Sequence, residues 1–202
     1  NVFSFLTFSL DGDDDNVYPH LQITNDALSW NNVHHDRFDV SKLAQWEKIL
    51  EYADKKGIYM HFKTQETEND QLMDGGQLGR ERKLYYRELI ARFGHHLALN
   101  WNLGEENDIW QELNDPENLL VKSYAQYIKD IDPYDHNIVI HTYPDQQDEV
   151  YGTLLGNDSE LTGASIQTSG NLSQVRSSVK KWVSEADLNG KKWIVACDEP
   201  GS

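Results

Sequence analysis

The sequence predicts an α/β protein built on a parallel sheet of the (β/α)8 barrel type. Six short apolar stretches alternate with helical stretches along the 202 residues. Several apolar stretches are hydrophobic on successive residues, which is typical of strands buried on both faces of a parallel sheet. Polar and aromatic residues follow these strands directly. Functional groups at the carboxyl ends of successive strands are characteristic of a (β/α)8 barrel.

Each predicted element has its own local pattern. Short runs of β-branched, aromatic and aliphatic residues predict strands at 2–8, 58–62, 97–101, 137–141, 161–167 and 193–197. Amphipathic periodicity predicts helices from Ser41 to a stop at Gly57 and over 81–93, 118–131 and 173–186. Two connections, 64–78 and 143–160, are long, polar and contain glycine, which is typical of functional lids or mobile loops.

Composition and charge disfavour several classes of partner and fold. Asp and Glu total 34 against 18 Lys and Arg, a formal charge of −16 that repels nucleic acids and anionic membranes. No apolar run approaches the roughly 18 residues of a membrane span. The single cysteine, Cys197, forms neither an internal disulfide nor a Cys-rich zinc site. No Gly-x-Gly-x-x-Gly or Walker-type loop follows a strand, which disfavours nucleotide-binding folds. The oligomeric state is not predicted.

Acidic residues at two strand ends are the candidate catalytic groups. Glu105 and Glu106 follow the strand at 97–101, and Glu199 follows the strand at 193–197. Retaining hydrolysis of a glycosidic bond needs one protonated and one ionised carboxyl, about 5–5.5 Å apart. Residues three strands apart face each other across the mouth of a barrel, so this fold places such a pair together.

The same strand ends resemble those of a known enzyme clan. Trp101-x-Leu103-Gly104-Glu105-Glu106 resembles the end of the fourth strand in the retaining (β/α)8 glycoside hydrolases, and Asp198-Glu199-Pro200-Gly201 resembles the end of their seventh. With Asp11-Gly12-Asp13 and Lys63-Thr64-Gln65-Glu66, these segments are similar to exported bacterial glycosidase-like barrels flanked by β-sandwich domains. The resemblance implies that residues 1–202 form strands two to seven of an incomplete barrel, as a segment of a longer chain.

The resemblance also implies roles for individual residues. Glu106 falls on the acid/base and Glu199 on the nucleophile of a double-displacement reaction on a poly- or oligosaccharide, without a cofactor, in a secreted or periplasmic bacterial protein. Glu105 replaces the clan's Asn, which contacts the sugar 2-hydroxyl, and as a neighbouring carboxylate it is expected to raise the pKa of Glu106. Further substrate contacts are expected from Asn102, Glu105, Lys63, Gln65, Glu66, His141, Tyr143 and Gln167, with Trp101 and Trp110 as stacking platforms.

Side-chain direction is expected to separate the two adjacent carboxylates. Successive residues at a strand end point in opposite directions, so only one of Glu105 and Glu106 is expected to face the barrel axis. The blander alternatives are a solvated helix-start pair for these two residues and an exposed loop position for Glu199. His141 is equally well explained as a structural, hydrogen-bonded histidine.

Other functions stay open from the sequence. The main rival is a non-catalytic carbohydrate-binding barrel or inactive fragment, whereas the lack of a His-x-His strand end disfavours a metal-dependent hydrolase. Asp11, Asp13 and Asp15 have the spacing of a calcium loop, but Asn16 and Gln22 stand where that loop needs Gly and Glu, so a structural calcium is only weakly indicated. The pairs His34-His35 and His95-His96 lack the i, i+4 spacing of helical metal ligands and are interpreted as solvated or structural.

Overall fold

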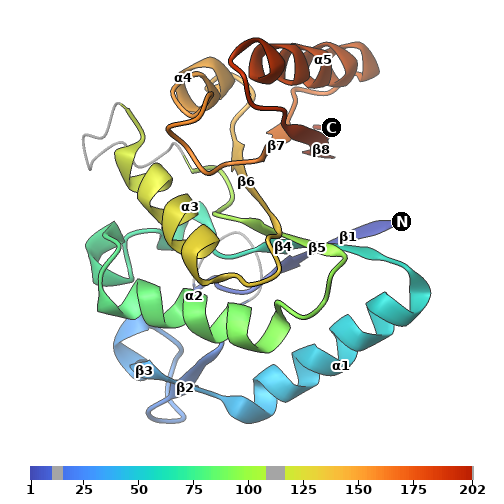
Figure 1. Ribbon diagram of the computed structural model, residues 1–202. Coiled ribbons are helices and arrows are strands. Elements are labelled where there is room, and N and C mark those ends of the chain that lie inside the picture. Colours follow the sequence, from blue (N-terminus) through green and yellow to red (C-terminus); the bar gives the residue numbers. More distant parts are fainter. Residues whose placement is uncertain (11–15, 108–116, 202) are drawn as a thin grey trace.

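The computed structural model describes residues 1–10, 16–107 and 117–201. Its centre is a sheet in the order β1-β4-β5-β6-β7-β8, with every neighbouring pair parallel. These strands are Val2–Leu6, Tyr59–Lys63, Leu99–Asn102, Asn137–Thr142, Gly163–Gln167 and Ile194–Glu199. The sheet curls into part of a barrel, and both termini lie on the same side of the molecule, near β1 and β8 (Figure 1). The predicted α/β fold with six neighbouring barrel strands is confirmed.

The helices flank the curled sheet on its outer side (Figure 1). They are α1 (Val40–Lys56), α2 (Arg80–Phe93), α3 (Leu119–Ile131), α4 (Gln147–Gly152) and α5 (Leu172–Leu188). Helix α1 begins after Asp39, whose carboxylate accepts hydrogen bonds from the backbone N–H groups of Ser41 and Lys42. It ends at Gly57, which takes a left-handed φ of 64° that favours glycine.

The structure contains elements that the sequence analysis did not predict. An antiparallel pair, β2 (His20–Gln22) and β3 (Val33–Phe38), stands between β1 and α1. Helix α4 lies inside the connection 143–160, for which no helix was predicted. The connection 64–78 includes a buried stretch at 64–67 and contains two short 3-10 turns.

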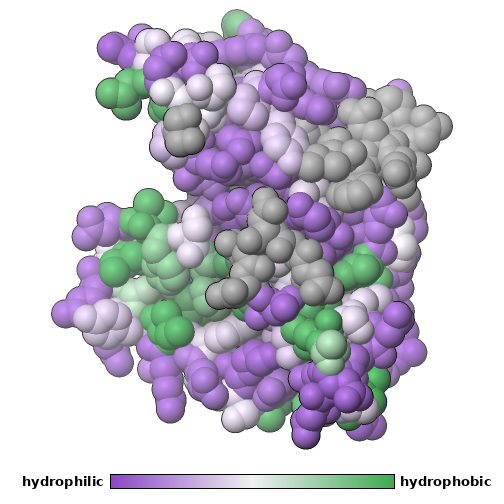
Figure 2. Space-filling view, turned by 180° about the vertical axis from the view of Figure 1, so that it is seen from behind, coloured by the Kyte–Doolittle hydropathy of each residue, from purple (hydrophilic) through white to green (hydrophobic). Residues whose placement is uncertain are grey.

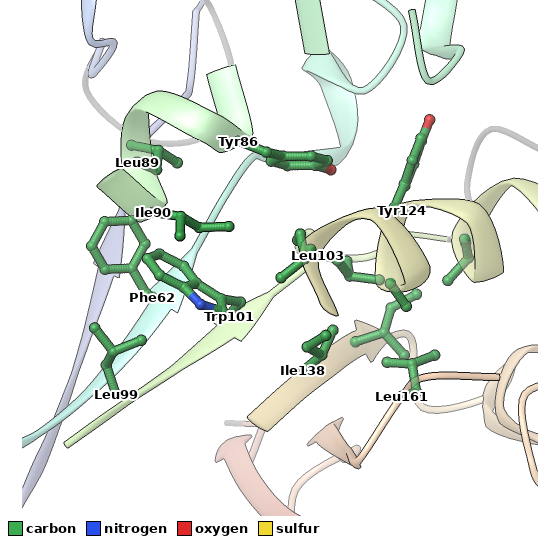
Figure 3. Close-up of a cluster of buried hydrophobic side chains, with 14 of the residues drawn as sticks. Phe62, Tyr86, Leu89, Ile90, Leu99, Trp101, Leu103, Tyr124, Ile138 and Leu161 are labelled. Carbon is green, nitrogen blue, oxygen red and sulfur yellow. The ribbon is translucent and has the colours of Figure 1, made fainter. Parts of the chain in front are cut away.

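The apolar core lies between the sheet and its helices. Phe62 of β4 and Trp101 of β5 project toward α2, where they meet Leu89 and Ile90 (Figure 3). The rings of Phe62 and Trp101 pack edge to face, 4.9 Å apart. Because successive side chains of a strand point to opposite faces, the residues next to Phe62 and Trp101 in the sequence point to the concave face of the sheet.

That concave face is polar, although it is buried. Its side chains are His61, Asn100, Asn102, His141 and Ser165, each at most 7% exposed. His61 hydrogen-bonds to Asn100, at 3.1 Å, to Asn102, at 3.0 Å, and to Ser165, at 3.3 Å. The strands therefore place a hydrogen-bonded polar layer directly below the carboxyl edge of the sheet.

The outside of the molecule is mainly hydrophilic. Seen from behind, polar side chains dominate and hydrophobic residues form only small patches (Figure 2). Among the described residues, no helix has both the length and the apolar character that a membrane span requires.

Candidate active site

Glu106 and Glu199 meet at the carboxyl edge of the sheet. Glu106 follows β5 and Glu199 ends β8, and Gln167 at the end of β7 lies between them. The Gln167 side-chain nitrogen donates to Glu199 Oε1 at 2.6 Å and to Glu106 Oε1 at 3.2 Å. Added together, these two distances limit the separation of the two carboxylate oxygens to 5.8 Å. Retaining glycosidases use carboxyls about 5–5.5 Å apart, and inverting enzymes use roughly 6.5–9.5 Å.

The environment of Glu106 favours its protonated form. Burial raises the pKa of Glu106, and the negative charge of Glu199 adds to this effect. Hydrogen bonds from Tyr143 and Gln167 oppose the increase without cancelling it. The sequence analysis expected the neighbouring Glu105 to raise the pKa of Glu106. In the structure, burial and the charge of Glu199 raise it instead.

Glu105 lies on a different side of the same turn. Its Oε1 is 2.6 Å from the ammonium nitrogen of Lys63, the last residue of β4. Strand β5 has already ended at Asn102, and Glu106 takes a left-handed φ of 48°. Strand alternation therefore does not apply here, and both carboxylates contact groups of the site: Glu105 toward β4, and Glu106 toward β6 and β7.

Asp198 joins the site to the polar layer beneath it. Its two oxygens lie 3.2 Å from His141 Nδ1 and 3.3 Å from His61 Nε2. Burial disfavours the charged carboxylate, but hydrogen bonds and positive charge from the two histidines outweigh it and hold the pKa of Asp198 far below its usual range. The pKa of Lys63 is raised, because Asp198 and Glu105 outweigh its own burial.

His141 connects this layer to the candidate nucleophile. With Nδ1 against Asp198, its Nε2 lies 3.7 Å from Glu199 Oε2. His61 and Asp198 were not predicted as site residues. The sequence could have indicated both residues. His61 stands two residues before Lys63, on the same face of the strand, and Asp198 directly precedes Glu199.

Several residues that were predicted to contact the substrate are buried. Trp101 is buried in the core, and its indole nitrogen donates to Asp132 at 3.0 Å, so it is not a sugar platform. Gln65 and Glu66 are buried, and the Gln65 side chain accepts a hydrogen bond from Arg82. Asn102 is also buried and bonds to His61 and to the Gly104 backbone.

The remaining predictions divide between the site and the undescribed segments. Tyr143 and Gln167 contact Glu106 directly, as expected of residues at this edge. Trp110, like the candidate calcium residues Asp11, Asp13 and Asp15, lies outside the described residues.

Fold and site together define an α/β, barrel-type protein with a carboxylate pair at the carboxyl edge of its parallel sheet. A similar solved structure is a "putative glycoside hydrolase" from Bacteroides vulgatus ATCC 8482, with a TM-score of 0.66 and 19% identity over 98% of this chain and 38% of that one. Another is a glycoside hydrolase family 5 protein from the same organism, with a TM-score of 0.54 and 16% identity over 78% of this chain and 33% of that one. The chain thus spans about a third of the length of these structures, and at such identities the likeness shows a shared fold.

Comparison of the sequence itself adds no relative: no protein-family model matches it, and no curated protein matches it.

Proposed function

We propose that this chain carries the two catalytic carboxyls of a glycoside hydrolase that acts on a poly- or oligosaccharide with retention of configuration. The observation that carries the proposal is the placement of Glu106 and Glu199 on one side-chain nitrogen of Gln167. The fold shared with two proteins described as glycoside hydrolases supports the same reaction class.

The first step joins the sugar to the protein. The protonated Glu106 gives its proton to the glycosidic oxygen while a Glu199 oxygen attacks the anomeric carbon. The bond between that carbon and the leaving oxygen breaks as the ester bond to Glu199 forms. The raised pKa of Glu106 keeps a larger share of this residue protonated near neutral pH.

The second step releases the sugar and restores both carboxyls. Glu106, now ionised, takes a proton from water as the water oxygen attacks the anomeric carbon and displaces Glu199. The Glu199 side chain is 43% exposed, so this carboxylate is open to a substrate from solvent. Gln167 and His141 position it through contacts at 2.6 Å and 3.7 Å.

One observation favours the rival function, a barrel that binds carbohydrate without cleaving it. Glu105 occupies the place of an Asn in the clan that the sequence resembles, and Lys63 holds its carboxylate at 2.6 Å. A sugar hydroxyl at this position therefore meets a carboxylate that is paired with Lys63, where the clan offers an amide. This change alters a substrate contact that the catalytic members of the clan use.

The test compares three substitutions in the full-length protein on substrates with good and poor leaving groups. Glu106→Gln is expected to lower activity on poor leaving groups about 10²–10⁴-fold and to affect activated aryl glycosides much less, since these hardly need protonation. Glu199→Gln is expected to abolish both activities, because no covalent intermediate forms. Glu105→Gln is the matched control and keeps the leaving-group dependence of the parent protein.

Two results contradict the proposal. If Glu105→Gln shows the leaving-group effect while Glu106→Gln stays active, the acid is wrongly assigned. If the folded parent protein binds oligosaccharides but cleaves none, including activated aryl glycosides, the non-catalytic function is correct.

A further inference from the structure

A second cluster of metal-ligand side chains lies at the opposite end of the strands from Glu106. It consists of Glu47 in the middle of α1 and of His95 and His96, which follow α2 and precede β5. One ligand atom from each residue lies within 4.8 Å of the other two. The Glu47 carboxylate faces both imidazoles, with Oε1 3.1 Å from His95 Nε2 and Oε2 3.3 Å from His96 Nε2.

These spacings fit a small divalent cation with tetrahedral coordination. Zinc binds imidazole nitrogen and carboxylate oxygen at about 2.0–2.2 Å, which places neighbouring tetrahedral ligand atoms roughly 3.3–3.5 Å apart. The two contacts involve different oxygens of the Glu47 carboxylate, and each is close to that separation before any ion is considered. Two imidazoles and one carboxylate suit zinc and its neighbours better than calcium or magnesium, which prefer oxygen ligands.

The orientation of His96 provides an independent argument. Its side chain is 1% exposed, and its Nδ1 lies 2.6 Å from Asp54 Oδ2. Asp54 lies in α1, about two turns after Glu47. A carboxylate that accepts the Nδ1 proton leaves the Nε2 lone pair free, which is the arrangement found around histidines that bind metals. In this case the free nitrogen is the one that faces Glu47 and His95.

The backbone of the cluster is fixed from the core. The carbonyl oxygen of His96 accepts a hydrogen bond from His136 Nε2 at 3.1 Å, and His136 is in turn held by Asp132 at 2.7 Å. His95 is half-exposed, so an ion can enter from solvent. The cluster thus combines one fixed, buried ligand with one accessible ligand.

We propose that Glu47, His95 and His96 form a zinc-binding site, with Asp54 orienting His96 and water as the fourth ligand. The ion joins α1 to the turn before β5 at the amino end of the strands, a face of such barrels that supports stability and not catalysis. The expectation that His95 and His96 are only solvated or structural considered them as a pair, without the carboxylate that α1 supplies.

The experiment uses the full-length protein without a polyhistidine tag, stripped of metal with a chelator. Zinc is titrated in competition with a chromophoric chelator, and thermal unfolding is followed with and without zinc. The parent protein is expected to bind one equivalent of zinc and to show a higher Tm when loaded, because the ion binds only the folded state. Co²⁺ in place of zinc is expected to give the visible absorption of a tetrahedral site.

Variants assign the ligands. His95→Ala and Glu47→Gln are expected to remove the bound equivalent and the Tm shift, and His95→Ala leaves the metal-free Tm unchanged because the side chain is half-exposed. Asp54→Asn is expected to weaken zinc binding about 10- to 100-fold. His34→Ala, which removes one histidine from the other His-His pair, is the matched control and retains full binding.

Two outcomes overturn the proposal. In the first, the stripped parent protein neither binds an equivalent of zinc nor changes its Tm, so the three side chains contact one another without holding a metal. In the second, zinc binds His95→Ala as tightly as it binds the parent protein, so the ion lies elsewhere.

Discussion

Replacement of His20 by Phe tests whether a neutral histidine is buried in the aromatic cluster beneath β2. The His20 ring is 1% exposed and packs against the rings of Phe8, Trp30 and Phe38, at centroid distances of 5.7, 5.4 and 5.0 Å. Neither of its nitrogens has a hydrogen-bond partner among the described residues. Burial, together with the nearby positive charges of His35 and Lys42, lowers the pKa of His20 from 6.5 to about 3.

The sign and size of the effect follow from that pKa. Between pH 6.5 and about 3 the unfolded chain binds a proton that the folded His20 does not, so the free energy of unfolding decreases as the pH decreases. Each pH unit in this window corresponds to about 1.4 kcal/mol, so His20 alone lowers stability by roughly 2 kcal/mol between pH 7 and pH 5. His20→Phe removes this term, and it also removes two unpaired buried nitrogens.

Urea unfolding at pH 7 and pH 5 measures the difference. The parent protein is expected to lose roughly 2 kcal/mol more than His20→Phe over this interval. His34→Phe, in the adjacent strand β3, retains His20 and is expected to follow the parent protein. The explanation is refuted if the stability difference between parent and His20→Phe is the same at both pH values, because His20 is then not a neutral, unpaired group in the folded state.

Two further predictions concern the candidate active site. Gln167→Leu removes a hydrogen bond that lowers the pKa of Glu106, so the alkaline limb of the pH–rate profile is expected to move to higher pH as activity falls; a limb that moves to lower pH contradicts the assignment. Gly104→Ala places a Cβ against the Asn107 side-chain nitrogen and 3.1 Å from Gln65 Cγ; since both are side-chain atoms that can shift, a loss of only about 1 kcal/mol in unfolding free energy is expected. Gly152→Ala meets nothing within 4 Å and is the control, so equal losses in both variants refute the clash.

The sequence predicted the sheet because its signals are local. Each strand of the sheet lies in a short stretch rich in apolar residues, and a parallel arrangement follows when such stretches alternate with helices. The β2–β3 pair was not predicted, because His20–Gln22 is only three residues long and its register shifts along β3. Helix α4 has six residues, too few for a helical period to show clearly in the sequence.

The sequence analysis selected strand-end residues that lie together in the structure, and it failed where the direction of a side chain decides its contacts. Asn100 and Asn102 face the concave side of β5, so Trp101 between them must face the helices, an inference that alternation alone supports. Gln65 is different, because its partner Arg82 lies 17 residues further along the chain and no local pattern relates them. The left-handed backbone conformation of Glu106 could not be predicted either, because a Glu-Glu dipeptide gives no indication of a positive φ.

The charges around the site divide its acidic groups into two sets. Asp198 is held by His61 and His141, and Glu105 is held by Lys63 at 2.6 Å. The pKa of Asp198 lies far below its usual range, so this carboxylate stays ionised, and its contacts suit it to orient its neighbours and not to exchange protons.

Glu106 and Glu199 lie at the carboxyl edge of the sheet, beside the polar layer of the concave face. Both are held by the neutral amide of Gln167, and the pKa of Glu106 is raised. Two neighbouring carboxyls whose environments differ in this way are the arrangement in which one acts as acid and the other as nucleophile. Under the proposed function, the polar concave face of the sheet does more than fill the barrel interior: its basic side chains pair with Asp198 and Glu105, which leaves the roles of acid and nucleophile to Glu106 and Glu199.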